Sequence, residues 1–178
     1  MQKNKSHQKV GFAVAIDGPV ASGKGTIASR LADRLSGFYL YTGSMYRCIA
    51  LYCIKKSIPV TNETAVENVL KSISIEFKED KILLNGTDVC EEIKQKEIAM
   101  AGSTVSLYKG VRKDMVRRQQ EIAYTYMKRG EIVVAEGRDI GTRVLQNAAL
   151  QSFLYSQQYE ITIYFTYYRY SILSTYHY

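Results

Sequence analysis

The sequence lacks the features that mark secreted, membrane-spanning and multidomain proteins. Its 178 residues suffice for one α/β domain but not for two full domains. Cys48, Cys53 and Cys90 form no C-x-x-C pair, so we expect buried thiols in a reducing cytoplasm rather than redox or metal sites. After the basic N-terminus (Lys3, Lys5, Lys9), the apolar run Phe12–Ile16 is too short for a signal peptide core or a membrane span. These absences predict a soluble cytoplasmic protein with no membrane partner.

Positive charge is in excess. The chain has 24 Lys and Arg against 17 Asp and Glu, a net charge of +7 that attracts anions such as nucleotides and nucleic acids. A nucleic-acid binder would combine a basic groove with stacking aromatics. Here the basic residues are dispersed and the tyrosine-rich end is almost uncharged, so we expect no nucleic-acid partner.

Two short apolar runs predict buried strands that end at one site. Phe12–Ile16 leads through a glycine-rich turn into a helix over Thr26–Leu35, where apolar residues recur every four positions. Ile132–Ala135 leads into the polar residues 136–139. Ligands of open α/β sheets bind beyond the carboxyl ends of strands, so both predicted strands point at one site.

The middle of the chain predicts helices around a small antiparallel insert. A helix is expected over Gly43–Ile54, and alternating apolar residues over Ile73–Val89 predict strands. Asn85-Gly86 is a strong hairpin signal within them, and we place the insert at about residues 60–96. Helical patterning returns over Glu97–Arg129. Its second apolar stripe contains Val111, Met115, Ile122 and Tyr126.

The turn after the first predicted strand matches a phosphate-binding loop. Residues 18–24, G-P-V-A-S-G-K, fit the motif G-x-x-x-x-G-K. They lie between a predicted strand and a predicted helix, and this context favours a phosphate-binding loop over a glycine-rich turn that binds nothing. Glycines let backbone N–H groups face phosphates, and the lysine reaches the β and γ oxygens. The following G-T is typical of nucleoside monophosphate kinases. The predicted ATP-binding residues are Gly18, Pro19, Val20, Ala21, Ser22, Gly23, Lys24, Gly25 and Thr26.

Further segments resemble bacterial cytidylate kinase in order and spacing over about residues 10–150. They are A-I-D-G-P at 15–19 with G-K-G-T at 23–26, Y-T-G-S-M-Y-R at 41–47, A-G-S at 101–103 with V-R at 111–112, R-R-Q at 117–119, and A-E-G-R-D-I-G-T at 135–142. The resemblance implies an α/β P-loop nucleoside monophosphate kinase fold, with a parallel sheet, flanking helices and a small antiparallel β insert. It also implies a monomeric enzyme that phosphorylates CMP and dCMP with ATP and Mg²⁺.

The resemblance assigns acceptor residues outside the loop. An arginine one turn into the second helix offers a planar fork to a phosphate dianion. Cytosine presents an amino donor and two acceptors, which suit hydroxyl, guanidinium and carboxylate groups. The implied CMP-binding residues are Thr42, Arg47, Ser103, Arg112 and Asp139.

Catalytic roles are implied for Lys24, which steadies the migrating phosphoryl group, and for Arg138, which neutralises its charge. Magnesium is expected at Thr26, held through ATP. Alternatively, Arg138 and Asp139 only pair with each other. Arg117 and Arg118 are interpreted as a basic helix face.

The last segment differs in composition from the rest. Residues 151–178 hold eight of the 15 tyrosines, and Glu160 and Arg169 are their only ordinary charges. Phe153-Leu154 is still similar to the family's next core strand, but family members then continue through an arginine-rich lid helix and a final helix. We therefore predict a kinase core over 1–150 and, over 151–178, an aberrant tail that replaces the lid and C-terminal part, as in a truncated or frame-disrupted member. A catalytically impaired nucleotide-binding remnant and another nucleoside monophosphate kinase remain alternatives.

Overall fold

The computed structural model describes residues 11–78, 80–157, 160–167 and 170–177, with side chains through Tyr155. The N-terminal lysines considered above lie outside these residues. The chain forms two compact units, which we describe separately. Unit 1 consists of Met1–Tyr41 with Gln119–Tyr178, and unit 2 consists of Thr42–Arg118. The predicted insert at about 60–96 falls inside unit 2.

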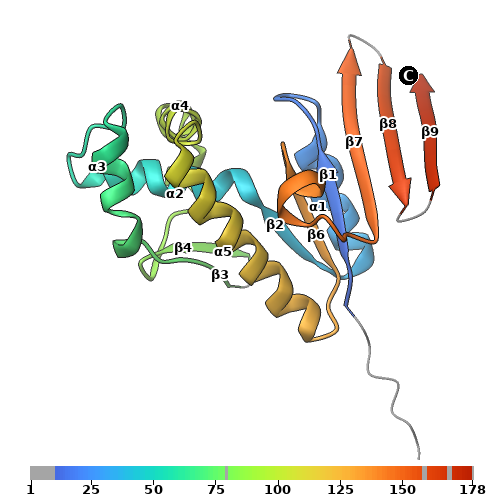
Figure 1. The fold of residues 1–178 in the computed structure, drawn as a ribbon, viewed down its shortest axis with the longest axis horizontal. Coiled ribbons are helices and arrows are strands. Elements are labelled where there is room, and N and C mark those ends of the chain that lie inside the picture. Colours follow the sequence, from blue (N-terminus) through green and yellow to red (C-terminus); the bar gives the residue numbers. More distant parts are fainter. Residues whose placement is uncertain (1–10, 79, 158–159, 168–169, 178) are drawn as a thin grey trace, which may run out of the picture. The chain divides into compact units, whose positions relative to one another are not determined.

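Unit 1 is built on a six-stranded sheet of order β2-β6-β1-β7-β8-β9 (Figure 1). The first four of these are parallel, whereas β8 and β9 continue the sheet antiparallel. Central strands of a parallel sheet are buried on both faces, so their sequences are unbroken apolar runs. This explains why the sequence alone predicted two of these strands. The strands are β1 (Ala13–Asp17), β2 (Phe38–Tyr41), β6 (Val133–Gly137), β7 (Leu150–Gln157), β8 (Glu160–Tyr167) and β9 (Tyr170–His177).

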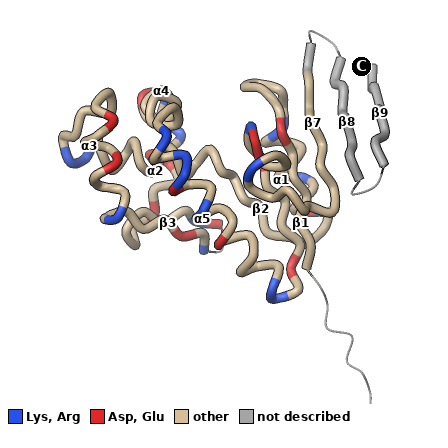
Figure 2. Tube along the Cα trace, viewed as in Figure 1, with Lys and Arg blue, Asp and Glu red and all other residues tan. Residues whose placement is uncertain are grey.

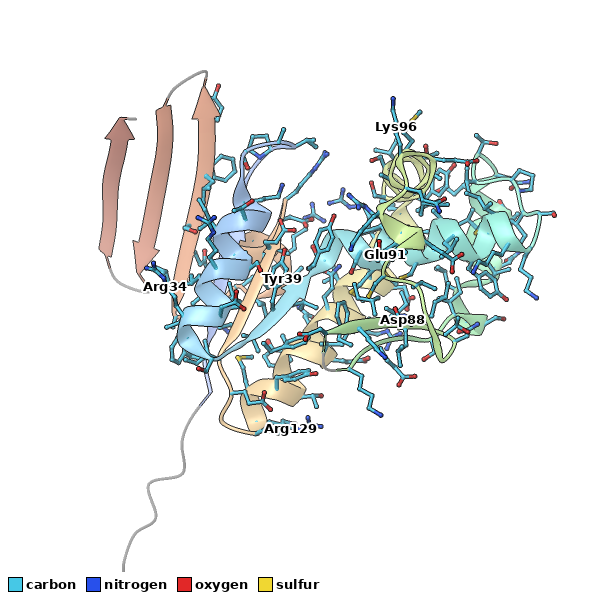
Figure 3. The ribbon with its side chains drawn as sticks, turned by 180° about the vertical axis from the view of Figure 1, so that it is seen from behind. Arg34, Tyr39, Asp88, Glu91, Lys96 and Arg129 are labelled. Carbon is cyan, nitrogen blue, oxygen red and sulfur yellow. The ribbon has the colours of Figure 1, made fainter. Side chains whose placement is uncertain are left out.

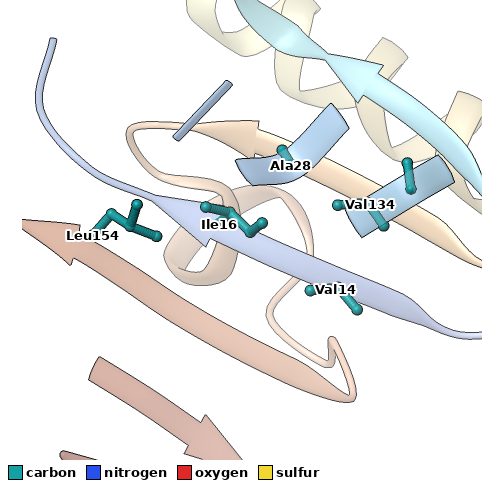
Figure 4. Close-up of a cluster of buried hydrophobic side chains, with 6 residues drawn as sticks. Val14, Ile16, Ala28, Val134 and Leu154 are labelled. Carbon is teal, nitrogen blue, oxygen red and sulfur yellow. The ribbon is translucent and has the colours of Figure 1, made fainter. Parts of the chain in front are cut away.

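The core of unit 1 lies between this sheet and helix α1 (Lys24–Leu35), which confirms the helix predicted after the loop. Figure 4 shows the buried cluster, to which the helix contributes Ala28 and Ala32 and the strands Val14, Ile16, Val134 and Leu154. Leu154 comes from β7, which pairs with β1, so the expected next core strand is confirmed. The division of the chain at about residue 150 stays a prediction.

Unit 2 combines helices with the small antiparallel sheet β3-β4-β5, which confirms the predicted insert. Asn85 and Gly86 both have positive φ, 49° and 81°, as a tight hairpin turn between β4 and β5 requires. Cys48 and Cys53 are buried as expected, while Cys90 is partly exposed. The elements are α2 (Thr42–Lys55), α3 (Glu63–Asn68), β3 (Ile75–Lys78), β4 (Lys81–Leu84), β5 (Thr87–Asp88), α4 (Lys96–Val105) and α5 (Lys109–Lys128), with 3-10 turns at Leu70–Ser72 and Glu92–Lys94.

The helical region predicted over Glu97–Arg129 is two helices, α4 and α5, and the division between the units falls within α5. The buried positions of α5 recur every four residues and include Gln119 and Ala123, whereas Ile122 and Tyr126 of the predicted stripe are only half-buried. Tyr126 instead stacks on Phe38, with ring centroids 3.7 Å apart. Within the described part of the chain, we find no helix with the length and apolar character that a membrane span needs.

Candidate functional site

The predicted phosphate loop joins β1 to α1 in unit 1. Gly23 is the N-cap residue of α1, with φ of 79°, and has no side chain to cap the helix. The first N–H groups of a helix lack partners within the helix, and together with the helix dipole they favour an anion at this end. The loop therefore combines an uncapped helix start with the lysine that follows it.

Gly18 and Ser22 give the loop a tight, polar interior. A Cβ atom at Gly18 would lie 2.5 Å from the Leu154 carbonyl oxygen and 2.9 Å from Ser22 Oγ, so no larger residue fits. Ser22 is 3% exposed, and its hydroxyl has no hydrogen-bond partner among the described residues. Buried polar groups normally have a partner, and a phosphate oxygen would supply one. The loop interior thus fits a phosphate.

Lys24 lies across the loop. Its Nζ donates a hydrogen bond of 3.1 Å to the Pro19 carbonyl oxygen and lies 3.8 Å from Glu136 Oε2. Glu136 is buried at the end of β6 and also accepts a hydrogen bond from Tyr39. Burial, followed by the charge of Glu136, raises the pKa of Tyr39, so this phenol stays protonated.

Asp17 ties the end of β1 to the segment after β6. Its Oδ1 accepts from Ile140 N at 2.7 Å and its Oδ2 from Gly141 N at 2.8 Å, at the start of a π-helical turn (Ile140–Val144). Burial raises the pKa of Asp17 and outweighs these two hydrogen bonds, which lower it; the charge of Asp139 adds to the rise and that of Lys24 opposes it. Asp17 thus fixes the backbone next to Asp139.

Arg138 and Asp139 follow β6 as predicted, but they do not form the alternative pair. Arg138 is exposed, and one ion-pair partner of Asp139 is Arg143, whose Nε lies 3.8 Å from Asp139 Oδ2. Arg143 is one helical turn further along, so the pair is local to the π-helical turn. The exposed Arg138 therefore lies outside this ion pair.

In unit 2, Arg47 is positioned by α2 and α4. Its Nη1 donates 3.3 Å to the Ile93 carbonyl oxygen, and a Cβ atom at Gly102 would lie 3.1 Å from Arg47 Cγ. Glycine at 102 therefore lets the two helices approach closely around the arginine stem. Thr42 begins α2 and is buried.

The other predicted residues of unit 2 lie on α4 and α5. Ser103 is exposed and donates to the Ala99 carbonyl oxygen of its own helix at 3.1 Å. Arg112 lies in the first turn of α5 and is half-buried. A serine hydroxyl bonded to its own helix can rotate to a ligand, because its hydrogen position is not fixed.

Arg118 does not belong to a solvated helix face, so that interpretation is wrong for this residue. Its guanidinium donates to the Ile73 and Leu70 carbonyl oxygens at 2.5 and 2.7 Å and pairs with Asp114. Arg117 is exposed and also pairs with Asp114, as a basic surface residue does. Arg118 therefore holds α5 to the segment before β3.

Each unit thus contains part of the predicted set. Unit 1 contains the loop, Lys24 and the Arg138-Asp139 segment, and unit 2 contains Thr42, Arg47, Ser103 and Arg112. The sequence predicted no role for Tyr39, Asp17 and Glu136, although Asp17 is the last residue of β1 and Glu136 the last but one of β6. Figure 2 shows acidic and basic residues interspersed in the described chain. The described residues contain no cluster of three or more His, Cys, Asp or Glu that fits a metal ion.

Several known proteins similar to this chain are named cytidylate kinase. The family described as cytidylate kinase matches residues 14–162. A cytidylate kinase of Bacillus cytotoxicus is 42% identical over 147 residues, which cover 80% of this chain and 63% of that relative. A cytidylate kinase of Bacillus thuringiensis is 40% identical over the same shares of both chains. This chain therefore spans 63% of the length of these relatives, and it belongs to the cytidylate kinase family.

Proposed function

We propose that this chain phosphorylates CMP and dCMP with ATP, giving CDP and dCDP. The observation that carries the proposal is the loop of unit 1, where an uncapped helix start, a buried unpartnered serine hydroxyl and Lys24 meet in a chain of the cytidylate kinase family. We further propose that the chain acts as a monomer in the cytoplasm, without a nucleic-acid partner.

The loop would hold the donor phosphates. Backbone N–H groups of Gly18–Thr26, other than at Pro19, and the hydroxyl of Ser22 would supply hydrogen bonds to phosphate oxygens. The Lys24 ammonium has three N–H donors, of which the Pro19 carbonyl takes one, so others remain for the β and γ oxygens. Positive charge at this point stabilises the charge that develops during transfer.

Magnesium would enter with ATP. It prefers hard oxygen ligands and is commonly held by substrate phosphates and few protein groups, so the hydroxyl of Thr26, exposed in the first turn of α1, fits it. When bound, Mg²⁺ neutralises charge on the β and γ phosphates.

Acceptor binding is proposed for Thr42, Arg47, Ser103 and Arg112 of unit 2 and for Asp139 of unit 1. Arginine forks match the acceptor phosphate, and hydroxyl and carboxylate groups match the donor and acceptor edge of cytosine. The carbonyl of Ile93 and the close approach of Gly102 hold the Arg47 side chain in place before a ligand arrives. Pre-positioning of this kind lowers the entropy cost of binding.

The proposed reaction is a direct in-line transfer. An oxygen of the CMP phosphate attacks the γ-phosphorus of ATP, the bond from that phosphorus to the β–γ bridging oxygen breaks, and ADP leaves. Such transfers need positioning and charge stabilisation more than covalent help from the protein. Lys24 and the exposed guanidinium of Arg138 are the groups proposed to stabilise the migrating charge.

A coupled assay of ADP release tests the proposal, with CMP, dCMP, UMP and AMP as separate acceptors. We expect turnover that depends on CMP or dCMP and is much slower with the others. Preference for UMP or AMP would refute the cytosine assignment. ATP binding without acceptor-dependent turnover would instead identify a catalytically impaired nucleotide-binding remnant.

A further inference from the structure

The buried carboxylate of Glu136 has no role in the proposed mechanism, yet it is the acidic neighbour of Lys24. Glu136 is 4% exposed, and an ionised carboxylate at such a site needs partners. Its Oε2 lies 3.8 Å from Lys24 Nζ, which is an ion pair but too long for a hydrogen bond. The lysine alone therefore does not fix the orientation of this carboxylate.

Tyr39 supplies a directional contact to Glu136. An ionised carboxylate only accepts hydrogen bonds, so the phenol donates. A Cβ atom at Gly25 would lie 3.6 Å from the Tyr39 hydroxyl oxygen and 3.9 Å from Glu136 Oε1, so both atoms border the residue next to Lys24. Figure 3 labels Tyr39, which lies in strand β2.

We propose that Tyr39 is a positioning residue for the phosphate loop: its hydroxyl holds Glu136 so that Lys24 stays free to bind phosphate. Loss of this hydroxyl removes one of the contacts that orient Glu136, so the carboxylate is less restrained from shortening its contact with Lys24 to a direct charge-assisted hydrogen bond. Such a bond would compete with a phosphate for the ammonium. The inference rests on the proposed function, because it requires a nucleotide phosphate on the loop.

Tyr39→Phe removes one hydroxyl and keeps the ring, so it tests the contact with little change in packing. ATP and CMP affinities are measured separately by calorimetric titration of the full chain. We expect Kd for ATP to rise by about tenfold, as for a lost hydrogen bond to a charged group, while Kd for CMP changes less than about twofold. The matched control is Tyr124→Phe, an exposed phenol on α5, which should change neither value.

A double-mutant cycle identifies the route through Glu136. In a Glu136→Gln background the neutral amide cannot form an ion pair with Lys24 and competes with a phosphate only weakly, so adding Tyr39→Phe should change Kd for ATP by less than about twofold. A second cycle in the Lys24→Ala background gives the same expectation and needs no change at the buried acid. Equal ATP affinity of the unsubstituted and Tyr39→Phe chains, or a full effect in both backgrounds, would overturn the inference. An unsubstituted chain that binds no ATP would refute the proposed function as well.

Discussion

Replacement of Asp17 by alanine removes the acceptor of two buried backbone N–H groups. The carboxylate accepts from Ile140 and Gly141 at 2.7 and 2.8 Å, in a region where Ile140 is 1% exposed. A buried donor left without a partner costs about 1–3 kcal/mol, so two cost about 2–6 kcal/mol, and removal of a desolvated carboxylate offsets part of this. We expect Asp17→Ala to lower the free energy of unfolding by about 2–4 kcal/mol.

Urea unfolding followed by circular dichroism measures this loss. The matched control is Asp33→Ala on the exposed side of α1, which should stay within about 0.5 kcal/mol of the unsubstituted chain. If Asp17→Ala also stayed within that range, the carboxylate would not hold the turn after β6, and our account of how Asp139 is positioned would be wrong.

The pH dependence of Asp17 gives a second readout of the same site. Burial raises the pKa of Asp17 above its ordinary value of 3.8, so the folded state binds the proton more tightly than the unfolded state. Its contribution to stability is complete below pH 3.8 and is lost as pH rises through the folded pKa. The stability of the unsubstituted chain relative to Asp17→Asn, which does not titrate, should therefore fall as pH rises from 3.8 and then level off. A difference that grows with pH would contradict the dominance of burial.

Three further substitutions test the loop, the acceptor residues and the fold of unit 2. Lys24→Ala should slow CMP-dependent ADP release by about 100-fold or more, and near-normal turnover would remove the loop from the mechanism. Arg47→Lys keeps the positive charge but loses the planar guanidinium, so KM for CMP should rise roughly tenfold while KM for ATP stays unchanged. Equal increases in both KM values would argue against a role of Arg47 in binding the acceptor. Arg118→Ala removes the guanidinium donor from two backbone carbonyls, of which only the Leu70 carbonyl keeps another donor among the described residues, Ile73 N. We expect a loss of about 1–3 kcal/mol in urea unfolding, against about 0.5 kcal/mol or less for the exposed Arg117→Ala; similar losses would contradict the buried role of Arg118.

Short-range sequence patterns predicted those helices, strands and turns whose conformation is set by residues close to one another in the sequence. The run Phe12–Ile16, the glycines after it and the four-residue periodicity of Thr26–Leu35 are all short-range features, and β1, the loop and α1 follow them. Asn85-Gly86 predicted its hairpin for the same reason, because both residues tolerate positive φ.

Contacts between distant segments were not visible in the sequence. Asp17 bonds to residues more than 120 positions away, and Arg118 bonds to carbonyls about 45 positions earlier, so no local pattern distinguishes either from a surface charge. The stripe predicted for α5 is right at Val111 and Met115, which are buried, but wrong at Ile122 and Tyr126. The buried position 119 carries a polar glutamine, which apolar periodicity does not count. Asp17 and Glu136 stand at or next to the ends of β1 and β6. The positions of these two acids were the sequence feature that could have predicted the polar groups around Lys24.

Transfer of labelled phosphate tests the central claim most directly. The full chain is incubated with CMP, Mg²⁺ and ATP that carries the label only in its γ-phosphate, and the products are separated by chromatography. We predict that label appears in CDP in proportion to the chain added and that Lys24→Ala loses most of it. Label that stays in ATP, or that appears only as inorganic phosphate, would contradict the proposed transfer to CMP.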